Sequence, residues 1–406
     1  MPKLLQINVC SNMLSTGCIM EDISKVAIKH GWNCIVCFGR SSRKSVCQEI
    51  KIGNLFFTLE HYIENRLFDN EGLASRIATL ILIRKIKKEQ PDIIHLHNIH
   101  DHYINYKILF NYLNTTEIKV VWTIHDFWPI TGHCHHFIDA NCNKWITQCH
   151  ACPLQHSTVD SLLDRSKRNY LQKKTSFQSN RNMTLVPVSF WVGNMLKKSF
   201  LKDKNIIVIP NGIDVTSFPI EVPKHPLLPN DKFIILGVAR EWAYGDRKGL
   251  DEYLKISKML KDDEVIVLVG MSSSLASKMP KNILGIPRTK TKEELASIYR
   301  FSNVLLSLSS AETFGLTIIE ANLCGIPAIV YNNTAPPSLI TNNTGYVVEN
   351  KNTKVLYEKI QIVKTNGKSY YTKACVEHVL KNYDKDKNYE KYIELYNSLL
   401  QKGKQN

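Results

Sequence analysis

Short apolar runs alternate with longer amphipathic stretches along almost the whole chain. In the first half, the amphipathic stretches predict helices up to residue 30, at 72–90 and at 158–180. The apolar runs between them predict strands at 4–10, 33–38, 92–97, 119–124 and 184–189. Strands that alternate with helices are typical of parallel sheets joined by helical crossovers.

A second alternating series follows a turn of the form Pro-Asn-Gly at 210–212. Its predicted strands lie at 232–239, 264–270, 282–284, 303–307, 327–330 and 345–348, and an amphipathic helix is predicted at 389–400. We therefore expect an α/β protein with two doubly wound, Rossmann-like domains at 1–205 and 206–385, followed by a C-terminal helix at 386–406 that packs back toward the first domain. Such domains bind ligands at the carboxyl ends of their strands, so we expect the two domains to face each other across a cleft.

Composition agrees with a globular protein of two domains. The chain has 406 residues, of which 44% are hydrophobic and 22% charged. No apolar window is as long as a membrane-spanning helix requires, and the N-terminus lacks the features of a signal peptide. These features predict a cytoplasmic protein.

The formal net charge of +15 indicates an anionic partner, such as nucleic acid, an acidic membrane or a phosphorylated substrate. The basic residues concentrate at 84–88, 165–174 and 197–204. No aromatic residues alternate with them as in a base-stacking surface, so we expect no nucleic-acid partner. Solvated helix faces and contact with an anionic membrane both remain open explanations.

The candidate chemistry is densest between Glu312 and Glu320. Here one carboxylate precedes a turn that contains Gly315, and the second falls inside the helix predicted to follow. The start of that helix would present free N–H groups and a positive dipole end to a phosphate. Thr317 and Glu320 also match the spacing of a capping box, in which Glu320 would only satisfy a backbone donor.

Other charged residues follow predicted strands. Arg240 ends one strand and Lys248 follows eight residues later, so the two cations could hold a diphosphate and stabilise the charge that develops on it. His125 ends a strand of the first half and is followed by Asp126, which favours contact with a ligand over a purely structural role. Gly17 lies where the first strand leads into the first helix, and a glycine there would let a substrate approach the backbone.

Together these motifs resemble the family 4 glycosyltransferases, retaining enzymes of the GT-B fold that use nucleotide-sugar donors. The resemblance extends over nearly the whole chain and is most specific at 312–327, which matches the Glu-x7-Glu signature of the family. The segments 237–240 and 248–249 match its phosphate motif, and 124–126 match the histidine of its first domain.

The resemblance implies a role for each matching residue. His125 would touch the transferred sugar, Glu312 would contact the donor sugar, and Arg240 with Lys248 would neutralise the diphosphate. The remaining donor-binding positions are Gly17, Arg288, Thr313, Phe314, Gly315, Leu316, Thr317 and Glu320, with Glu320 on the ribose hydroxyls.

The resemblance also has consequences for mechanism. It implies an acceptor-binding first domain, transfer on one face of the sugar, no dedicated nucleophile, and no catalytic metal. The chain departs from the family at 15–18, where a glycine pair is missing, and at 334–338, where Thr-Ala-Pro-Pro-Ser replaces a Gly-x-Pro-Glu turn.

An insertion at 128–153 is rich in histidine and cysteine. Its four cysteines predict a structural zinc site, because thiolates with one Cys-x-x-Cys pair suit a tetrahedral zinc ion. The predicted ligands are Cys134, Cys142, Cys149 and Cys152, and the alternatives are free thiols or substitution by His133, His135, His136 or His150. Similar insertions occur in glycosyltransferases of bacterial exopolysaccharide and colanic-acid-type pathways.

The leading hypothesis is a retaining glycosyltransferase that moves a sugar from a nucleotide-diphosphate donor to a glycan or lipid-linked acceptor during bacterial surface polysaccharide synthesis. It would work at the inner face of the plasma membrane. The alternatives are a nucleotide-sugar epimerase or hydrolase of the same fold, and a non-catalytic zinc-bearing binding protein.

Overall fold

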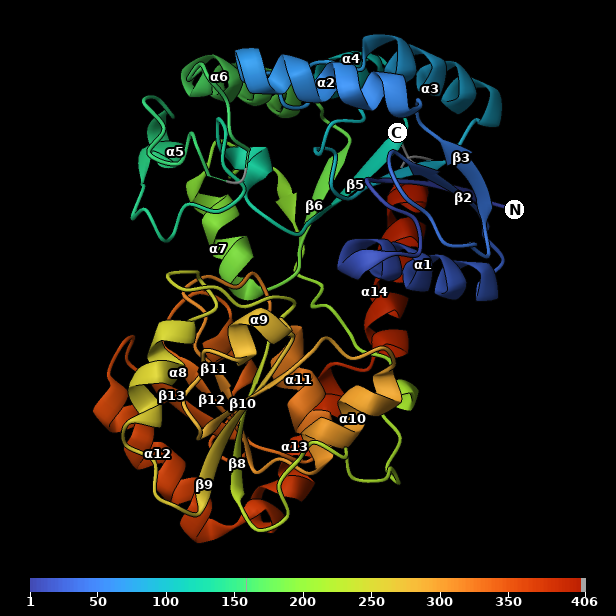
Figure 1. The fold of residues 1–406 in the computed structure, drawn as a ribbon. Helices are drawn as coiled ribbons and strands as arrows, with labels where there is room; N and C mark the ends of the chain where they lie inside the picture. The colour runs from blue at the N-terminus through green and yellow to red at the C-terminus, as the bar shows by residue number, and fades with distance from the viewer. Residues whose placement is uncertain (158, 403–406) are drawn as a thin grey trace. The chain divides into compact units, whose positions relative to one another are not determined.

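The computed structural model describes residues 1–157 and 159–402. The chain divides into two compact units, coloured continuously along the chain in Figure 1. The first unit contains Met1–Pro210 and the C-terminal segment from Asp386, and the second contains Asn211–Lys385.

The first unit is built on a parallel sheet of seven strands in the order β3-β2-β1-β4-β5-β6-β7. These strands are β1 (Lys3–Asn8), β2 (Asn33–Phe38), β3 (Gln48–Lys51), β4 (Ile93–Leu96), β5 (Lys119–Ile124), β6 (Met183–Pro187) and β7 (Asn205–Ile206). Its helices are α1 (Leu14–Lys29), α2 (Leu55–Phe68), α3 (Arg76–Glu89), α4 (Tyr106–Leu113), η1 (Trp128–Ile130), α5 (Lys144–Thr147), α6 (Ser166–Gln178), α7 (Phe190–Lys198) and α14 (Lys385–Lys402).

The C-terminal helix α14 packs on this first sheet through a row of tyrosines. Tyr389, Tyr392 and Tyr396 are almost fully buried, and they recur at the three- and four-residue spacing of one helix face. The hydroxyl of Tyr396 lies 2.7 Å from Nδ1 of His95 on β4, and that of Tyr392 lies 2.9 Å from Oγ1 of Thr123 on β5. The buried hydroxyls of Tyr392 and Tyr396 are thus hydrogen-bonded while the aromatic rings pack in the core.

The second unit is built on a parallel sheet of six strands in the order β10-β9-β8-β11-β12-β13. The strands are β8 (Phe233–Val238), β9 (Glu264–Val269), β10 (Ile283–Ile286), β11 (Val304–Ser307), β12 (Ala328–Tyr331) and β13 (Gly345–Val348). The helices are η2 (Val215–Ser217), α8 (Leu250–Ser257), α9 (Ser273–Ala276), α10 (Lys292–Arg300), α11 (Leu316–Leu323), η3 (Pro336–Leu339), α12 (Thr353–Asn366) and α13 (Lys368–Asn382).

The expected α/β class with two doubly wound sheets is confirmed, because every paired strand is parallel and helices connect all successive strands except β2 and β3. In the first unit, sequence analysis missed the helices α2, α4 and α7 and the short edge strand β3. The helix predicted at 158–180 begins only at Ser166, and residue 158 itself lies outside the described residues, as do 403–406 of the predicted C-terminal segment. Among the helices of the described chain, none is both long and apolar enough to cross a bilayer.

Candidate functional site

In the second unit, β8 and β11 are neighbours, and the loops that leave their carboxyl ends are bonded together. The backbone N–H of Ser310 donates to the carbonyl of Arg247 at 2.8 Å. Gly249 has a φ of +83°, and a Cβ built there would lie 2.6 Å from the carbonyl oxygen of Leu308. Only glycine permits both this conformation and this approach, so it lets the two loops meet.

This junction joins two of the predicted site residues. Nζ of Lys248 lies 2.5 Å from Oε1 of Glu312, and both side chains are about a quarter exposed (28% and 25%). The loop of Glu312 is held from the other side as well, because its N–H donates to Oγ1 of Thr334 at 3.1 Å. The structure therefore brings Lys248 and Glu312 into direct contact across these two loops.

Arg240 and Arg288 lie just beyond the carboxyl ends of β8 and β10. Both are exposed, and neither forms an ion pair with any other described residue. They leave positive charge at this edge of the sheet that no carboxylate of the described chain neutralises.

The helix α11 begins at this edge with an uncapped N-terminus. Gly315 is its N-cap residue, with a φ of 113°, and no side chain bonds to the first turn. That turn contains no acidic residue. Thr313, Leu316 and Thr317 are half-buried, while the Phe314 ring is buried beside Tyr383 with 5.9 Å between ring centroids. The free N–H groups and the helix dipole make this a favourable position for an anion.

Glu320 has side-chain partners. Its Oε1 lies 2.8 Å from Nζ of Lys292, and its Oε2 accepts a hydrogen bond from Tyr299 at 3.0 Å. The capping-box interpretation is wrong, because Thr317 lies inside the helix instead of at its N-cap position, which is Gly315, and Glu320 bonds to side chains instead of a backbone donor. The carboxylate is only 10% exposed, with Lys292 at its open side.

In the first unit, His125 follows β5 and ends a hydrogen-bonded chain of buried side chains. Its Nε2 lies 3.1 Å from Nδ1 of His97, whose Nε2 lies 2.9 Å from Oε1 of Gln6. The Gln6 amide donates from Nε2 to Met20 O and Ser24 Oγ, which leaves Oε1 to accept from His97. His97 therefore accepts at Nδ1 from the Nε2–H of His125, and Nδ1 of His125 is left as an acceptor.

The environment of His97 and His125 favours the neutral form of both imidazoles. Burial lowers the pKa of His125 to about 4, with His100 acting in the same direction, and burial holds the pKa of His97 well below its ordinary value. An uncharged imidazole is what the hydrogen-bond chain requires, since His97 must accept one bond while it donates the other.

Two family profiles match this chain almost end to end. The profile described as Glycosyltransferase Family 4 matches residues 20–217, and the profile described as Glycosyl transferases group 1 matches residues 220–375. The resemblance seen in the motifs is thereby confirmed. The chain belongs to the family 4 glycosyltransferases of the GT-B fold.

Individual relatives of this glycosyltransferase are distant. A putative colanic acid biosynthesis glycosyl transferase, WcaC, of Escherichia coli (strain K12) is 24% identical over 247 residues, which is 59% of this chain and 59% of that protein. The match thus spans less than two thirds of the relative.

Solved structures agree on the fold. Sucrose-phosphate synthase from Thermosynechococcus elongatus superposes with a TM-score of 0.71 at 16% identity, covering 98% of this chain and 99% of that one. HepE of Anabaena in complex with UDP-glucose superposes with a TM-score of 0.62 at 12% identity, covering 98% of this chain and 99% of that one.

In this glycosyltransferase Gly17 is buried within α1. A Cβ there would lie 2.9 Å from the carbonyl oxygen of Cys10, so helix packing alone requires a glycine. Its predicted contact with the donor stays a prediction.

The insertion of the glycosyltransferase brings all four predicted cysteines to one pocket, which His133 also lines. A side-chain hydrogen bond from Cys134, opposed by burial, lowers the pKa of the Cys152 thiol to about 7. His133 is held by Asp69, whose Oδ1 lies 2.7 Å from Nδ1, and its buried Nε2 has no hydrogen-bond partner among the described residues.

Sequence reasoning missed the residues that support these sites. Gln6, Lys292 and Tyr299 come from segments distant in sequence from the residues they contact. His97 follows its strand as His125 does, and that shared strand-end position marks it in the sequence as a further candidate ligand, but the sequence does not predict its bond to His125.

Proposed function

We propose that the protein is a retaining glycosyltransferase that moves a sugar from a nucleotide-diphosphate donor to a glycan or lipid-linked acceptor in polysaccharide synthesis. The observation that carries the proposal is the contact of Lys248 with Glu312 beside the uncapped start of α11. The name of the WcaC relative supports the pathway, and the UDP-glucose bound by HepE supports the type of donor.

The charges of the second unit suit a diphosphate. Arg240 has no carboxylate partner among the described residues, and the start of α11 supplies N–H donors. A diphosphate that approached Lys248 would compete with Glu312 for the ammonium group. Glu312 would then be free to accept hydrogen bonds from sugar hydroxyls, and the cations would stabilise the charge that develops on the leaving phosphate.

We assign the remaining roles on the same basis. Glu320 would bind the ribose hydroxyls after Lys292 moves away from it. Lys292 is exposed, and its Nζ lies 4.8 Å from the centroid of the Phe218 ring. His125 would accept a hydrogen bond from a sugar hydroxyl at its free Nδ1. A neutral imidazole of this kind positions a hydroxyl, and the low pKa makes it a poor general base at neutral pH.

For the acceptor, we propose that the first unit docks on an anionic membrane through an apolar surface on α2 and α3. Nine large apolar side chains on these helices are exposed by 42% to 81%: Leu55, Phe56, Leu59, Tyr62, Ile63, Phe68, Ile77, Leu80 and Ile81. The two helices lie next to each other in Figure 1 and are joined by the ion pair between Arg76 and Glu64.

The charge next to this α2–α3 surface favours lipid as its occupant. The exposed residues Arg84, Lys85, Lys87 and Lys88 continue α3 beyond the apolar side chains. Apolar side chains that enter the lipid boundary, with basic residues beside them, are typical of helices that lie on anionic membranes. Phe56→Ser with Leu59→Ser should weaken sedimentation with phosphatidylglycerol vesicles while binding to neutral vesicles stays low. Unchanged sedimentation would refute this surface, and a loss of dimers instead would identify it as a contact between copies.

We further propose a structural zinc ion in the cysteine pocket. All four cysteines line it together with His133, whose buried Nε2 has no hydrogen-bond partner among the described residues. The pKa of the Cys152 thiol is lowered to about 7, so this ligand is accessible as a thiolate at neutral pH, whereas burial raises the pKa of Cys149 to about 11 and a zinc ion would have to displace its proton. The zinc would tie the loop that follows His125 to the chain near Ser166, which also lines the pocket.

The proposed activity is tested with purified protein and a panel of nucleotide sugars. A true donor should raise the melting temperature, and an acceptor should then convert it to glycosylated product. Glu312→Gln should abolish transfer with an unchanged melting temperature, whereas the exposed control Glu358→Gln should retain it. Full activity of Glu312→Gln would remove the site assignment. Free sugar or an isomerised donor without any acceptor would identify a hydrolase or epimerase instead.

A further inference from the structure

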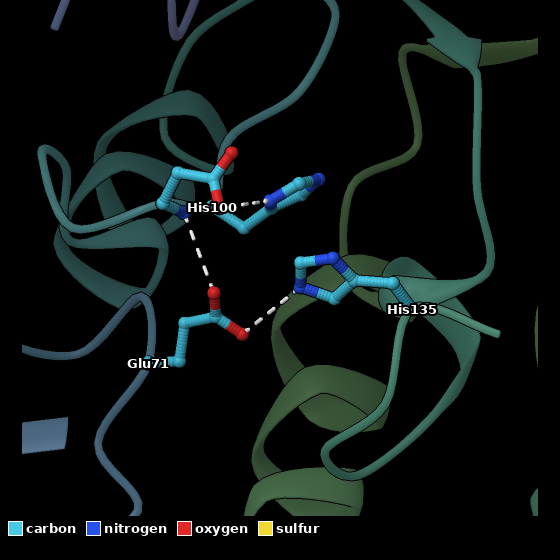
Figure 2. Close-up of side chains that lie close together, drawn as sticks. Glu71, His100 and His135 are labelled. Carbon is cyan, nitrogen blue, oxygen red and sulfur yellow. Dashed lines mark hydrogen bonds and ion pairs between the residues drawn. The ribbon is translucent and has the colours of Figure 1, made fainter. Parts of the chain in front are cut away.

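A second group of metal-ligand side chains lies outside the cysteine pocket, at the carboxyl edge of the first sheet. Glu71 lies between α2 and α3, His100 and Asp101 follow β4, and His135 lies in the insertion after β5. One possible ligand atom from each of the four residues lies within 4.8 Å of the others. Figure 2 shows Glu71, His100 and His135 turned toward one another from separate segments of the chain.

We propose that Glu71, His100, Asp101 and His135 bind a first-row divalent transition-metal ion such as zinc. Two imidazoles and two carboxylates are suitable ligands for such an ion, and the two carboxylate charges balance it. The proposal does not depend on sugar transfer.

The strongest observation concerns His100, whose side chain is only 4% exposed. Its Nε2 lies 2.8 Å from Oδ2 of Asp126, a normal hydrogen bond. Its Nδ1 makes no hydrogen bond to any described residue and points toward Oδ1 of Asp101 at 3.4 Å. At 3.4 Å this contact is longer than a normal hydrogen bond, and a metal ion between the two atoms would bind both the imidazole lone pair and the carboxylate.

The distances within the group suit a bound metal ion better than direct hydrogen bonds between the histidines and the carboxylates. Nε2 of His135 lies 3.3 Å from Oε2 of Glu71, and the pair of His100 with Asp101 is 3.4 Å apart. Hydrogen bonds between charged groups are shorter, at about 2.7–2.9 Å. Bonds of about 2.0–2.1 Å to a tetrahedral ion place neighbouring ligand atoms about 3.3–3.4 Å apart. The pairs His135–Glu71 and His100–Asp101 already have that separation. Rotation of the side chains would bring the other ligand atoms, which lie up to 4.8 Å apart, to the same separation.

Asp126 orients His100 by a hydrogen bond to the ring nitrogen that does not face the proposed ion. Its Oδ2 accepts from His100, while its Oδ1 accepts from the backbone N–H of Trp128 at 2.9 Å. Carboxylates commonly orient metal-binding histidines in this way, because the bond fixes the ring and leaves the other nitrogen unprotonated. Asp101 is 37% exposed, so an ion could enter from solvent on its side.

The test is a metal titration of the full chain carrying Cys149→Ser and Cys152→Ser, which removes the cysteine pocket as a competitor. Cobalt should bind at one equivalent with visible d–d bands and without thiolate charge-transfer bands, and zinc should displace it. His135→Ala or Glu71→Gln should abolish this binding. Asp126→Asn should weaken it by about 10–100-fold. His156→Ala, an exposed histidine outside the group, should leave it unchanged.

Two results would overturn the proposal. One is a folded protein that binds no cobalt or zinc stoichiometrically, which would leave protonated histidines as the partners of the carboxylates. The other is binding that survives both His135→Ala and Glu71→Gln. If the cysteine variant does not fold, the same titration on the unsubstituted protein decides, because each substitution must then reduce the bound metal by one equivalent.

Discussion

Replacing Gly249 by alanine tests whether the junction of the two loops positions Lys248 against Glu312. The substitution adds one methyl group at a residue with a φ of +83°, where the new Cβ would lie 2.6 Å from the carbonyl oxygen of Leu308. A backbone carbonyl cannot rotate away as a flexible side chain can. The loop that carries Lys248 must therefore move away from the loop that carries Glu312.

The magnitude follows from two separate costs. A left-handed conformation costs an L-residue about 1–2 kcal/mol, and overpacking adds about 1–3 kcal/mol. Gly245 provides a matched control in the same loop, since its φ is +68° but no atom lies within 4 Å of an added Cβ. Gly245→Ala should show only the first cost, so the two variants should differ in free energy of unfolding by about 1–3 kcal/mol.

The assays are urea unfolding and the kcat/KM of sugar transfer. A displacement of Lys248 by about 1 Å should reduce kcat/KM by up to about 100-fold in Gly249→Ala. Gly245→Ala should stay within a few-fold of the wild type. Equal unfolding free energies and equal kcat/KM for the two variants would refute the idea that this contact positions the site.

Three further predictions concern buried polar side chains. Tyr299→Phe leaves Oε2 of Glu320 without its hydrogen bond, so urea unfolding should show a loss of about 1.5–3 kcal/mol; no loss would mean that water replaces the hydroxyl. Lys173 is buried, donates to the carbonyls of Trp128 and Thr131 at 2.8 and 3.1 Å, and lies 3.5 Å from the centroid of the Trp128 ring. Lys173→Met should therefore leave two buried carbonyls unpaired and destabilise the insertion. Proteolysis between residues 128 and 153 should then be faster than in the wild type, and an unchanged rate would contradict this prediction. The folded-state pKa of His125, about 4, lies below the ordinary histidine value of about 6.5. Between these two pH values the unfolded chain binds more protons than the folded chain, so stability should fall as pH drops from 6.5 to 4. Urea midpoints measured across that range should fall less steeply for His125→Asn, and identical slopes would show that His125 does not contribute.

The residues proposed for the donor site could be grouped from the sequence because they lie in short segments. Glu312, Gly315 and Glu320 share one strand-to-helix connection, and a carboxylate, a turn and a helix start at fixed spacing have few geometric outcomes. Arg240 and Lys248 similarly lie in one loop after β8. The same reasoning assigned no partner to Glu320, because Tyr299 and Lys292 come from another helix.

The insertion shows the opposite case. The spacing of its cysteines predicts that they form one group, whereas nothing in the sequence links Glu71 and His100 with His135, because the three lie in separate segments. Their meeting depends on how β4, β5 and the turn between α2 and α3 are arranged. Only the folded chain defines that arrangement.

Residue order alone predicts the two series of parallel strands, the Glu-x7-Glu segment and the glycines that its loops require. Those features depend on periodicity and on local backbone conformation, which are set by neighbours in the chain. Tertiary structure alone decided which side chains meet: Lys248 with Glu312, His125 with His97 and Gln6, and the group around His100. Charge state, hydrogen-bond direction and metal-ligand spacing all depend on distances across the fold, and packing of distant segments sets those distances.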